Sequence, residues 1–315
     1  MKIKKLIKDL HGKYQSDLSG DVCTSIPALG SVDPDLFAIS VTTIDGQVFN
    51  IGDVDTMFTI QSISKAFSYG LALEQHGSAF LEEKVGMEPT GEDFDSIIKL
   101  DDLSRPFNPM VNSGAIVTTS LINARNYKSR DDEILKYFEK FANQKFEVDE
   151  EIYESELSNS HKNWAIVHLL RHFRSISKDY ESDLKLYIKQ CSASLNIDSL
   201  SMMGATLANN GVNPITKKRC ISTQNLRHML SVIFTCGMYN YSGEWAFDVG
   251  LPAKSGVSGS ILMIVPGLMA ISVYSPRLDK RGNSVRGIKV CEELSQILKL
   301  HILDYGGPSR VSELT

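Results

Sequence analysis

Cysteine is scarce in this sequence, and the few cysteines form no recognisable pattern. There are five in 315 residues, an odd number without a C-x-x-C pair. This argues against a disulfide framework and predicts a reducing, cytoplasmic setting. Long apolar runs are also missing: no stretch reaches the ~18 residues that a membrane span needs, so we expect no membrane association. The lysines of residues 1–9 have no apolar run behind them, which predicts an amphipathic helix and not a signal peptide.

An excess of charge of one sign is lacking too. The formal net charge is −5 with acidic and basic residues interspersed, which argues against nucleic acid as a partner. The sequence contains no glycine-rich phosphate loop. His168 and His172 have the spacing of helical zinc ligands, but residues 169–171 lack the glutamate of the metalloprotease motif. We therefore expect neither a metal nor a cofactor.

Strand-like segments stand near both ends of the chain. Residues 35–43 and 47–51 are rich in β-branched and apolar residues and flank Asp45-Gly46, a strong hairpin signal. Residues 257–265 and 268–274 flank Pro266-Gly267 in the same way. The sequence therefore predicts one hairpin at each end.

The middle of the chain is predicted to be helical. Gly77 is a good helix stop, and Ser129 with Asp132 resembles a capping box. The polar residues 149–162 are predicted to be a loop, which could carry a binding site. Dense helix formers or helical spacing of apolar residues mark four segments: residues 66–75, 131–143, 163–174 and 223–234.

This order of elements predicts an α+β protein with one antiparallel sheet built from both termini. Residues 1–60 and 241–315 would form a sheet subdomain, and residues 61–240 a helical subdomain inserted in it. We expect the two to form one catalytic unit.

Ser62 and Lys65 form an S-x-x-K pair, whose members can lie on one face of a helix. A partly desolvated lysine can lose its proton and activate such a serine. The pattern alone is weak evidence, because it also begins at Ser96, Ser175 and Ser182. Context favours Ser62, since an apolar segment precedes it and an apolar helix follows. This predicts a buried helix N-terminus, where the helix dipole favours a developing anion.

A second motif supports Ser62. Lys254-Ser255-Gly256 precedes the strand expected from Val257. A K-[ST]-G segment on a strand beside an S-x-x-K serine occurs in β-lactamases and penicillin-binding proteins. Its backbone N–H groups could bind the oxyanion of an acyl-transfer intermediate.

Beyond these motifs, six longer blocks stand out in the sequence: residues 60–65 (IQSISK), 108–116 (NPMVNSGAI), 205–211 (ATLANNG), 236–243 (CGMYNYSG), 250–257 (GLPAKSGV) and 282–287 (GNSVRG). By these blocks the sequence resembles the serine-dependent glutaminases, relatives of β-lactamases, from about Gly20 to Gly287. The resemblance implies a β-lactamase/transpeptidase-like fold and the hydrolysis of L-glutamine to L-glutamate and ammonia. It also implies a homodimer or homotetramer.

The resemblance implies roles for four residues at the reacting end of the substrate. Ser62 would be the nucleophile and Lys65 its base, with Tyr239 as a second proton carrier. The backbone N–H groups of Ser62 and Val257 would form the oxyanion hole.

Four further residues would hold the amino-acid end of glutamine: Asn112, Glu156, Asn163 and Tyr187. Their chemistry agrees with this role. The carboxylate of Glu156 suits the substrate ammonium, and the amides and hydroxyl of the others suit its carboxylate.

One stretch departs from the resemblance. Family members usually carry D-Y-I-P where this chain has Thr24-Ser25-Ile26-Pro27. Ser25 thus replaces a tyrosine whose hydroxyl lies at the reacting end of the substrate. We expect weakened turnover, unless Tyr14 or Tyr69 has taken over the role.

Two alternative functions stay open at this point. A β-lactam-reactive serine hydrolase would share the S-x-x-K and K-[ST]-G motifs, although no export signal is evident. A glutamine-binding sensor that has lost turnover would be consistent with the change at Ser25.

Overall fold

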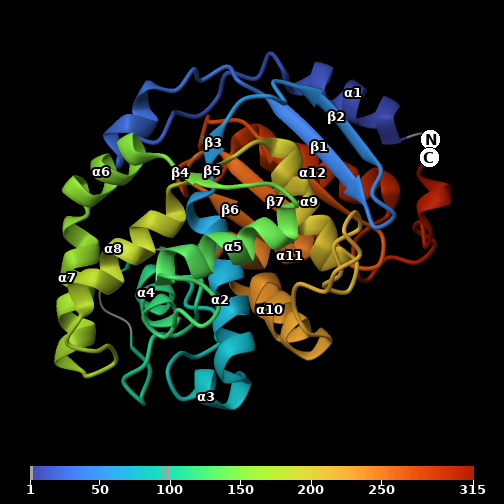
Figure 1. The fold of residues 1–315 in the computed structure, drawn as a ribbon. Coiled ribbons are helices and arrows are strands. Elements are labelled where there is room, and N and C mark those ends of the chain that lie inside the picture. Colours follow the sequence, from blue (N-terminus) through green and yellow to red (C-terminus); the bar gives the residue numbers. More distant parts are fainter. Residues whose placement is uncertain (1–2, 94, 97–99) are drawn as a thin grey trace.

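The main sheet joins the two ends of the chain, as the sequence predicts. The computed structural model describes residues 3–93, 95–96 and 100–315. Its five-stranded antiparallel sheet has the order β2-β1-β8-β7-β6 (Figure 1). The central pair places Ala38 opposite Tyr274. The strands are β1 (Ala38–Thr43), β2 (Val48–Gly52), β6 (Ala253–Gly256), β7 (Ser260–Val265) and β8 (Met269–Tyr274).

Both predicted hairpins are confirmed, with one correction to the second. Gly46 adopts a φ of 93° in the turn between β1 and β2, a conformation that favours glycine. The strand expected to begin at Val257 begins at Ser260 instead. Val257 lies in the turn that follows β6, and the K-S-G motif is itself part of β6. A glycine with a φ of 99°, Gly259, ends this turn.

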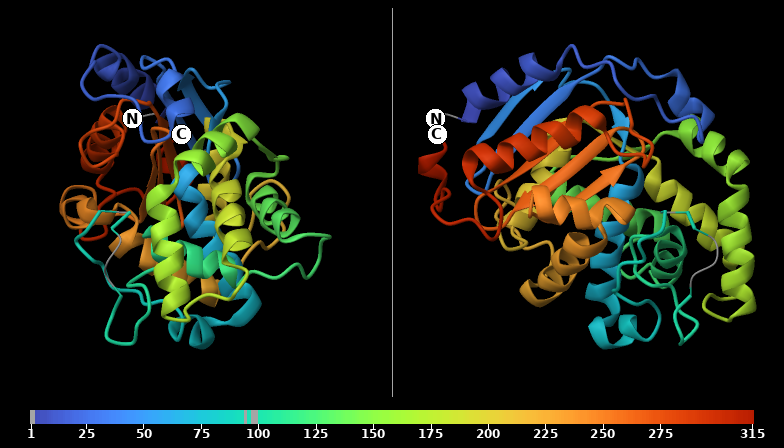
Figure 2. Two further views of the ribbon diagram at one scale, coloured as in Figure 1. Left: turned by 90° about the vertical axis from the view of Figure 1, so that its left-hand side faces the viewer. Right: turned by 180° about the vertical axis from the view of Figure 1, so that it is seen from behind.

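Helices cover both faces of this sheet (Figure 2). On one face α1 (Ile3–Tyr14) and α12 (Val285–Leu298) pack with inward residues such as Ile39 and Val41. On the other face lies α9 (Ile197–Ala208), whose Ser201 bonds to Thr42. The strands β1, β7 and β8 are therefore buried on both sides, which explains their largely apolar sequences, whereas the edge strand β2 is partly exposed.

The remaining helices form a second body of structure beside the sheet, with α2 between the two (Figure 1). A small sheet of order β3-β5-β4 links them. Its strands are β3 (Phe58–Thr59), β4 (Glu147–Val148) and β5 (Ala193–Leu195). The helices are α2 (Ser64–His76), α3 (Ser78–Glu82), α4 (Asn112–Ser120), α5 (Arg130–Ala142), α6 (Glu150–Asn159), α7 (His161–His172), α8 (Tyr180–Cys191) and α10 (Thr223–Cys236). A further helix, α11 (Ser242–Asp248), contributes Trp245 to the apolar cluster that α1 and α12 form with the main sheet.

The four helices predicted in the middle of the chain are confirmed within a few residues. Ser129 caps α5 by accepting a hydrogen bond from the N–H of Asp132, and Gly77 ends α2. The loop predicted over 149–162 is wrong, because α6 occupies most of it. Asp149 caps α6 by accepting from the N–H of Ile152 at 3.0 Å. The carboxylates of Glu150 and Glu151 lie in the first turn, where they interact favourably with the positive end of the helix dipole.

The division into subdomains 1–60 with 241–315 and 61–240 stays a prediction.

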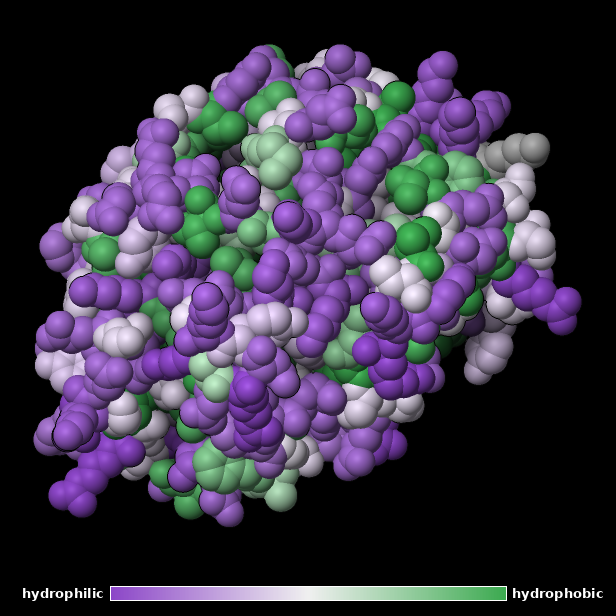
Figure 3. Space-filling model, in the orientation of Figure 1, coloured by the Kyte–Doolittle hydropathy of each residue, from purple (hydrophilic) through white to green (hydrophobic). Residues whose placement is uncertain are grey.

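Among the residues described, no helix is long and apolar enough to cross a membrane. The face in Figure 3 is mostly hydrophilic, with hydrophobic residues scattered over it, which is usual for a globular protein.

Candidate active site

Ser62 lies directly before α2, at the junction of the two bodies of structure. The chain leaves β3, passes through a 3-10 turn (Gln61–Ile63) and enters α2 at Ser64. Gln61, the residue before Ser62, has a φ of 47°, a left-handed conformation that costs a non-glycine residue free energy. Ser62 is 8% exposed and lines a cavity. The strained turn thus presents the hydroxyl of Ser62 at a helix N-terminus.

Lys65 is buried one turn further along, with an exposure of 1%. Its Nζ donates to Oδ1 of Asn112 at 2.6 Å and to Oη of Tyr239 at 3.2 Å. Tyr239 also shares a hydrogen bond with Ser62. The Tyr239 hydroxyl therefore connects the serine hydroxyl with the lysine amine.

Tyr239 has a strained backbone conformation and packs against a second buried lysine, Lys254. Its φ is 55°, again in the left-handed region. Two residues earlier, a Cβ on Gly237 would come within 1.9 Å of the carbonyl oxygen of Ala253, so only glycine allows this approach to β6. Nζ of Lys254 lies 3.9 Å from the centre of the Tyr239 ring and donates to the carbonyl of Ser255 at 2.8 Å. Burial lowers the pKa of Lys254 well below its usual value, so this close packing contact, and not a full positive charge, fixes the ring from the side of β6.

The residues predicted to hold the substrate converge from four helices. Asn112 begins α4, Asn163 lies in α7, Tyr187 in α8 and Glu156 in α6. Nδ2 of Asn112 donates to Oδ1 of Asn163 at 2.8 Å, and the hydroxyl of Tyr187 donates to Oδ1 of Asn112 at 3.2 Å. These contacts join Asn163 and Tyr187 to Lys65 through Asn112.

A cavity of about 370 Å³ lies against this network. Five of the eight predicted site residues line it: Ser62, Glu156, Asn163, Tyr187 and Val257. Lys65, Asn112 and Tyr239 are not among its lining residues. Oε2 of Glu156 is buried and has no hydrogen-bond partner among the residues described. A buried carboxylate oxygen without a partner is a site for a cationic group.

Burial changes the acid–base properties of the two charged groups in the site. It lowers the pKa of Lys65 to about 8, although the nearby acidic groups Cys191 and Glu156 oppose this shift. It raises the pKa of Glu156 to about 7, against the opposing effects of Lys65 and of a hydrogen bond from Gln61. Burial also raises the pKa of Tyr239 above its usual value. The site therefore offers a lysine that can be neutral near pH 8 beside a protonated tyrosine.

Ser25 lies at the rim of this cavity, on the loop that leads into a short 3-10 helix (Pro27–Ser31). Its hydroxyl is 3.2 Å from the Sγ of Cys23. The two tyrosines suggested as substitutes lie elsewhere. Tyr69 is packed in the core of the α2 region, and Tyr14 lies on α1 beside Lys13 and Glu293.

The other S-x-x-K pairs have surroundings unlike those of Ser62. Lys178 is exposed and Ser175 half-buried, and both members of the Ser182 pair are exposed. Lys99, the partner of Ser96, is outside the described residues. His168 packs against the rings of Trp164 in α7 and Tyr180 in α8. Across the described ranges, no group of three or more His, Cys, Asp or Glu side chains could hold a metal ion.

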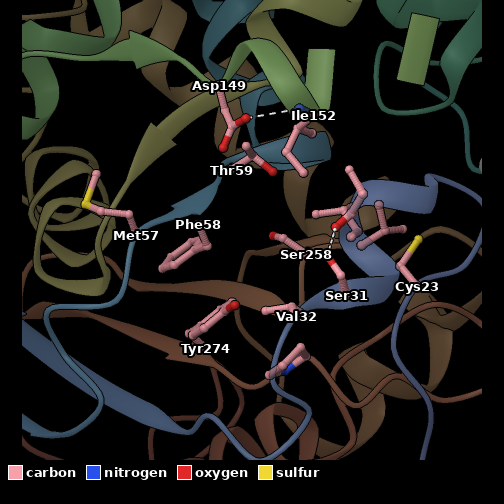
Figure 4. A pocket seen from close by; sticks show the side chains of 14 residues that line it. Cys23, Ser31, Val32, Met57, Phe58, Thr59, Asp149, Ile152, Ser258 and Tyr274 are labelled. Carbon is pink, nitrogen blue, oxygen red and sulfur yellow. Dashed lines mark hydrogen bonds between the residues drawn. The ribbon is translucent and has the colours of Figure 1, made fainter. Parts of the chain in front are cut away.

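A smaller cavity of about 210 Å³ has Val257 among its lining residues, and Figure 4 shows side chains that surround it. Phe58 and Tyr274 border it, with their rings stacked 4.2 Å apart. Of the predicted site residues, Val257 is the one that lines this cavity.

Two residues of the site were missed by sequence reasoning. Gln61 stood in the nucleophile block, but its strained φ and its bond to Glu156 have no sequence signature. Lys254 stood in the K-S-G motif, where only backbone groups were given a role. The available signal was a lysine between Ala253 and the strand-like residues that follow it. A lysine in a buried strand is rare unless it has a specific partner, so its presence there could have indicated a role for the side chain.

Comparison with known proteins gives one consistent result. A family model described as Glutaminase matches residues 20–303. A glutaminase of Nostoc sp. is 52% identical over 300 residues, covering 95% of this chain and 90% of that protein. A glutaminase of Microcystis aeruginosa is 46% identical over 301 residues, covering 96% and 89%.

Solved structures agree with the sequence relatives. The structure titled probable glutaminase ybaS has a TM-score of 0.92 and 39% identity, covering 96% of this chain and 98% of that one. A probable glutaminase of Bacillus subtilis has a TM-score of 0.88 and 30% identity, covering 96% and 99%. The mixed α+β architecture of this chain is thus similar to that of glutaminase structures.

Proposed function

The chain belongs to the glutaminase family and is a glutamine amidohydrolase, and from this premise we propose that it works through a glutamyl ester of Ser62. The observation that carries the proposal is the hydrogen-bonded connection from Ser62 through Tyr239 to Lys65. A serine is a poor nucleophile unless a base takes its proton, and a buried lysine with a lowered pKa is such a base.

In the proposed acylation, Oγ of Ser62 attacks the γ-carbonyl carbon of L-glutamine. Its proton passes to Lys65 by way of the Tyr239 hydroxyl, and the same groups return a proton to the departing ammonia. Water then attacks the ester, and the same base assists. Lys254 would act as a positioning residue, because its contact with the ring holds the hydroxyl of Tyr239 in line.

The proposed oxyanion hole consists of the N–H groups of Ser62 and Val257. The first lies at the start of a helix, and the second in the turn after β6. Two backbone donors fixed by separate elements need no reorganisation as negative charge develops on the oxygen.

We propose that Glu156 receives the substrate ammonium and that Asn112, Asn163 and Tyr187 receive its carboxylate. The unpartnered Oε2 of Glu156 supports this, since an ammonium would satisfy it. An incoming positive charge would also lower the pKa of this carboxyl and keep it ionised.

We expect kcat/KM to rise with pH and to level off above about pH 8. Lys65 accepts a proton only when neutral, and below its pKa of about 8 the neutral fraction falls about tenfold per pH unit. Glu156, with a pKa of about 7, must be ionised to bind ammonium, so its titration steepens the same acidic limb. The measurement is kcat/KM between about pH 5 and about pH 9. A flat profile over this range would argue against a lysine base.

We expect Ser25→Tyr to raise kcat/KM for glutamine. A tyrosine hydroxyl reaches farther from the backbone than a serine hydroxyl and could donate to the reacting carboxamide. Loss of such a donor costs roughly 10²–10³ in kcat, and a bridging water replaces it only in part. Wild type and variant are compared under identical conditions, with thermal stability as the control. A lower kcat/KM at unchanged stability would mean that the loop is adapted to serine.

The assay that tests the proposed function is ammonia release from glutamine by the purified protein. Slow but measurable turnover is the expected result. Glutamine binding in a calorimeter without ammonia release would favour the sensor, and turnover of nitrocefin would favour a β-lactam-reactive hydrolase.

Three broader expectations belong to the same proposal. The arrangement of an S-x-x-K helix beside a K-S-G strand supports a β-lactamase/transpeptidase-like fold. The free, buried cysteines are compatible with a cytoplasmic location. We further propose a homodimer or homotetramer, by analogy with the family.

A further inference from the structure

The cavity at Ser62 continues into a larger one on the far side of Ser25. We name the cavity at Ser62 the inner cavity and this larger one the outer cavity. The outer cavity has a volume of about 630 Å³. Ser25, Asp95 and Val257 line both cavities, so the two meet at these residues. The outer cavity could hold many water molecules, each of which occupies about 30 Å³ in the liquid.

The junction lies at the reacting end of the proposed substrate. Glu156, Asn163 and Tyr187 line the inner cavity, and none of them lines the outer one. Val257 borders both, and its N–H is proposed to bind the carbonyl oxygen that reacts. A substrate with its ammonium at Glu156 and its γ-carbonyl at Ser62 would therefore have its reacting end near the junction, where a chain carried by the amide nitrogen could extend into the outer cavity.

The walls of the outer cavity suit a flexible chain with apolar and polar parts. Val22, Leu278 and Val285 supply apolar surface. The charged residues that line the cavity are Asp21, Asp93, Asp95, Asp279, Lys280 and Arg281. The side chain that separates the cavities is small, and its hydroxyl already contacts Cys23. Nothing bulky at position 25 therefore closes the path from the amide nitrogen to the outer cavity.

We propose that this enzyme also hydrolyses γ-glutamyl amides whose nitrogen carries an alkyl chain, with the amine bound in the outer cavity. The proposal rests on the proposed function. Oγ of Ser62 bonds to the carbonyl carbon of the γ-carboxamide, and the bond between that carbon and the nitrogen breaks. The nitrogen takes the proton that Ser62 gave up, by way of Tyr239 and Lys65, and leaves as a primary amine. Water then hydrolyses the ester to glutamate, so the reaction needs no other reactant.

The probe is γ-glutamylbutylamide, with glutamine assayed in parallel on the same wild-type protein. We expect butylamine release with kcat/KM within about tenfold of that for glutamine, because the outer cavity accommodates the chain. Glutamine turnover without butylamine release would overturn this inference and leave the proposed function intact. Failure with both substrates would count against the proposed function itself.

The variant that locates the amine is Thr24→Trp, with Thr24→Ser as its matched control. Thr24 is exposed and lines the outer cavity but not the inner one. An indole there should lower the ratio of kcat/KM for γ-glutamylbutylamide to that for glutamine by about tenfold or more, since steric exclusion of a few methylenes has this size. The serine variant should keep the wild-type ratio. An unchanged ratio in Thr24→Trp would show that the amine does not occupy the outer cavity.

Discussion

Ser62→Ala and Lys65→Ala should each reduce glutamine turnover below detection, a loss of about 10⁴-fold or more. The nucleophile and its base act as a unit, so removing either one leaves little of the function of the other. Lys65→Met is a useful third variant, because it keeps most of the buried volume of the side chain without the amine. The measurement is kcat/KM for ammonia release, with circular dichroism to verify folding.

The chain contains its own control for this experiment. The tetrapeptide Ser-Ile-Ser-Lys at 62–65 recurs at 175–178, where Lys178 is exposed. Ser175→Ala and Lys178→Ala should leave activity unchanged. Full activity in Ser62→Ala would refute the proposed mechanism.

Glu156→Gln should lower kcat/KM for glutamine by about 30- to 5,000-fold, which corresponds to the roughly 2–5 kcal/mol lost when one partner of a desolvated charge pair is removed. The amide keeps the size of the side chain, so the fold should persist. Thermal melting checks this point.

Glu154→Gln is the matched control, because Glu154 lies on the same helix but is exposed. It should leave kcat/KM within about twofold of wild type, the usual range for surface changes. Equal kinetics in the two variants would mean that Glu156 does not receive the ammonium.

The sequence predicted the parts of the fold that depend on local signals. The hairpins at Asp45-Gly46 and Pro266-Gly267 and the cap at Ser129 follow from turn and cap chemistry, which acts over a few residues. The pair Ser62 and Lys65 was separated from its three repeats by its apolar neighbours, and burial distinguishes it in the structure.

The failures have two causes, a local signal that was given too little weight and contacts that only the folded chain creates. Residues 149–162 were predicted to be a loop because they are polar, yet α6 forms there and buries Glu156. Asp149 followed by two glutamates was a usable helix start, but polarity was given more weight. The left-handed φ of Gln61 and Tyr239 and the contact of Lys254 with the Tyr239 ring depend on tertiary packing, which local sequence does not encode.

The most direct test of the account is to find which residue carries the glutamyl group during turnover. Protein mixed with glutamine is quenched with acid, digested and mapped by mass spectrometry, with Ser62→Ala treated in parallel. We expect a glutamyl ester on the peptide containing Ser62 and none in the variant. A glutamyl group on another nucleophile, such as the neighbouring Cys191, or the same labelling in Ser62→Ala, would contradict the account.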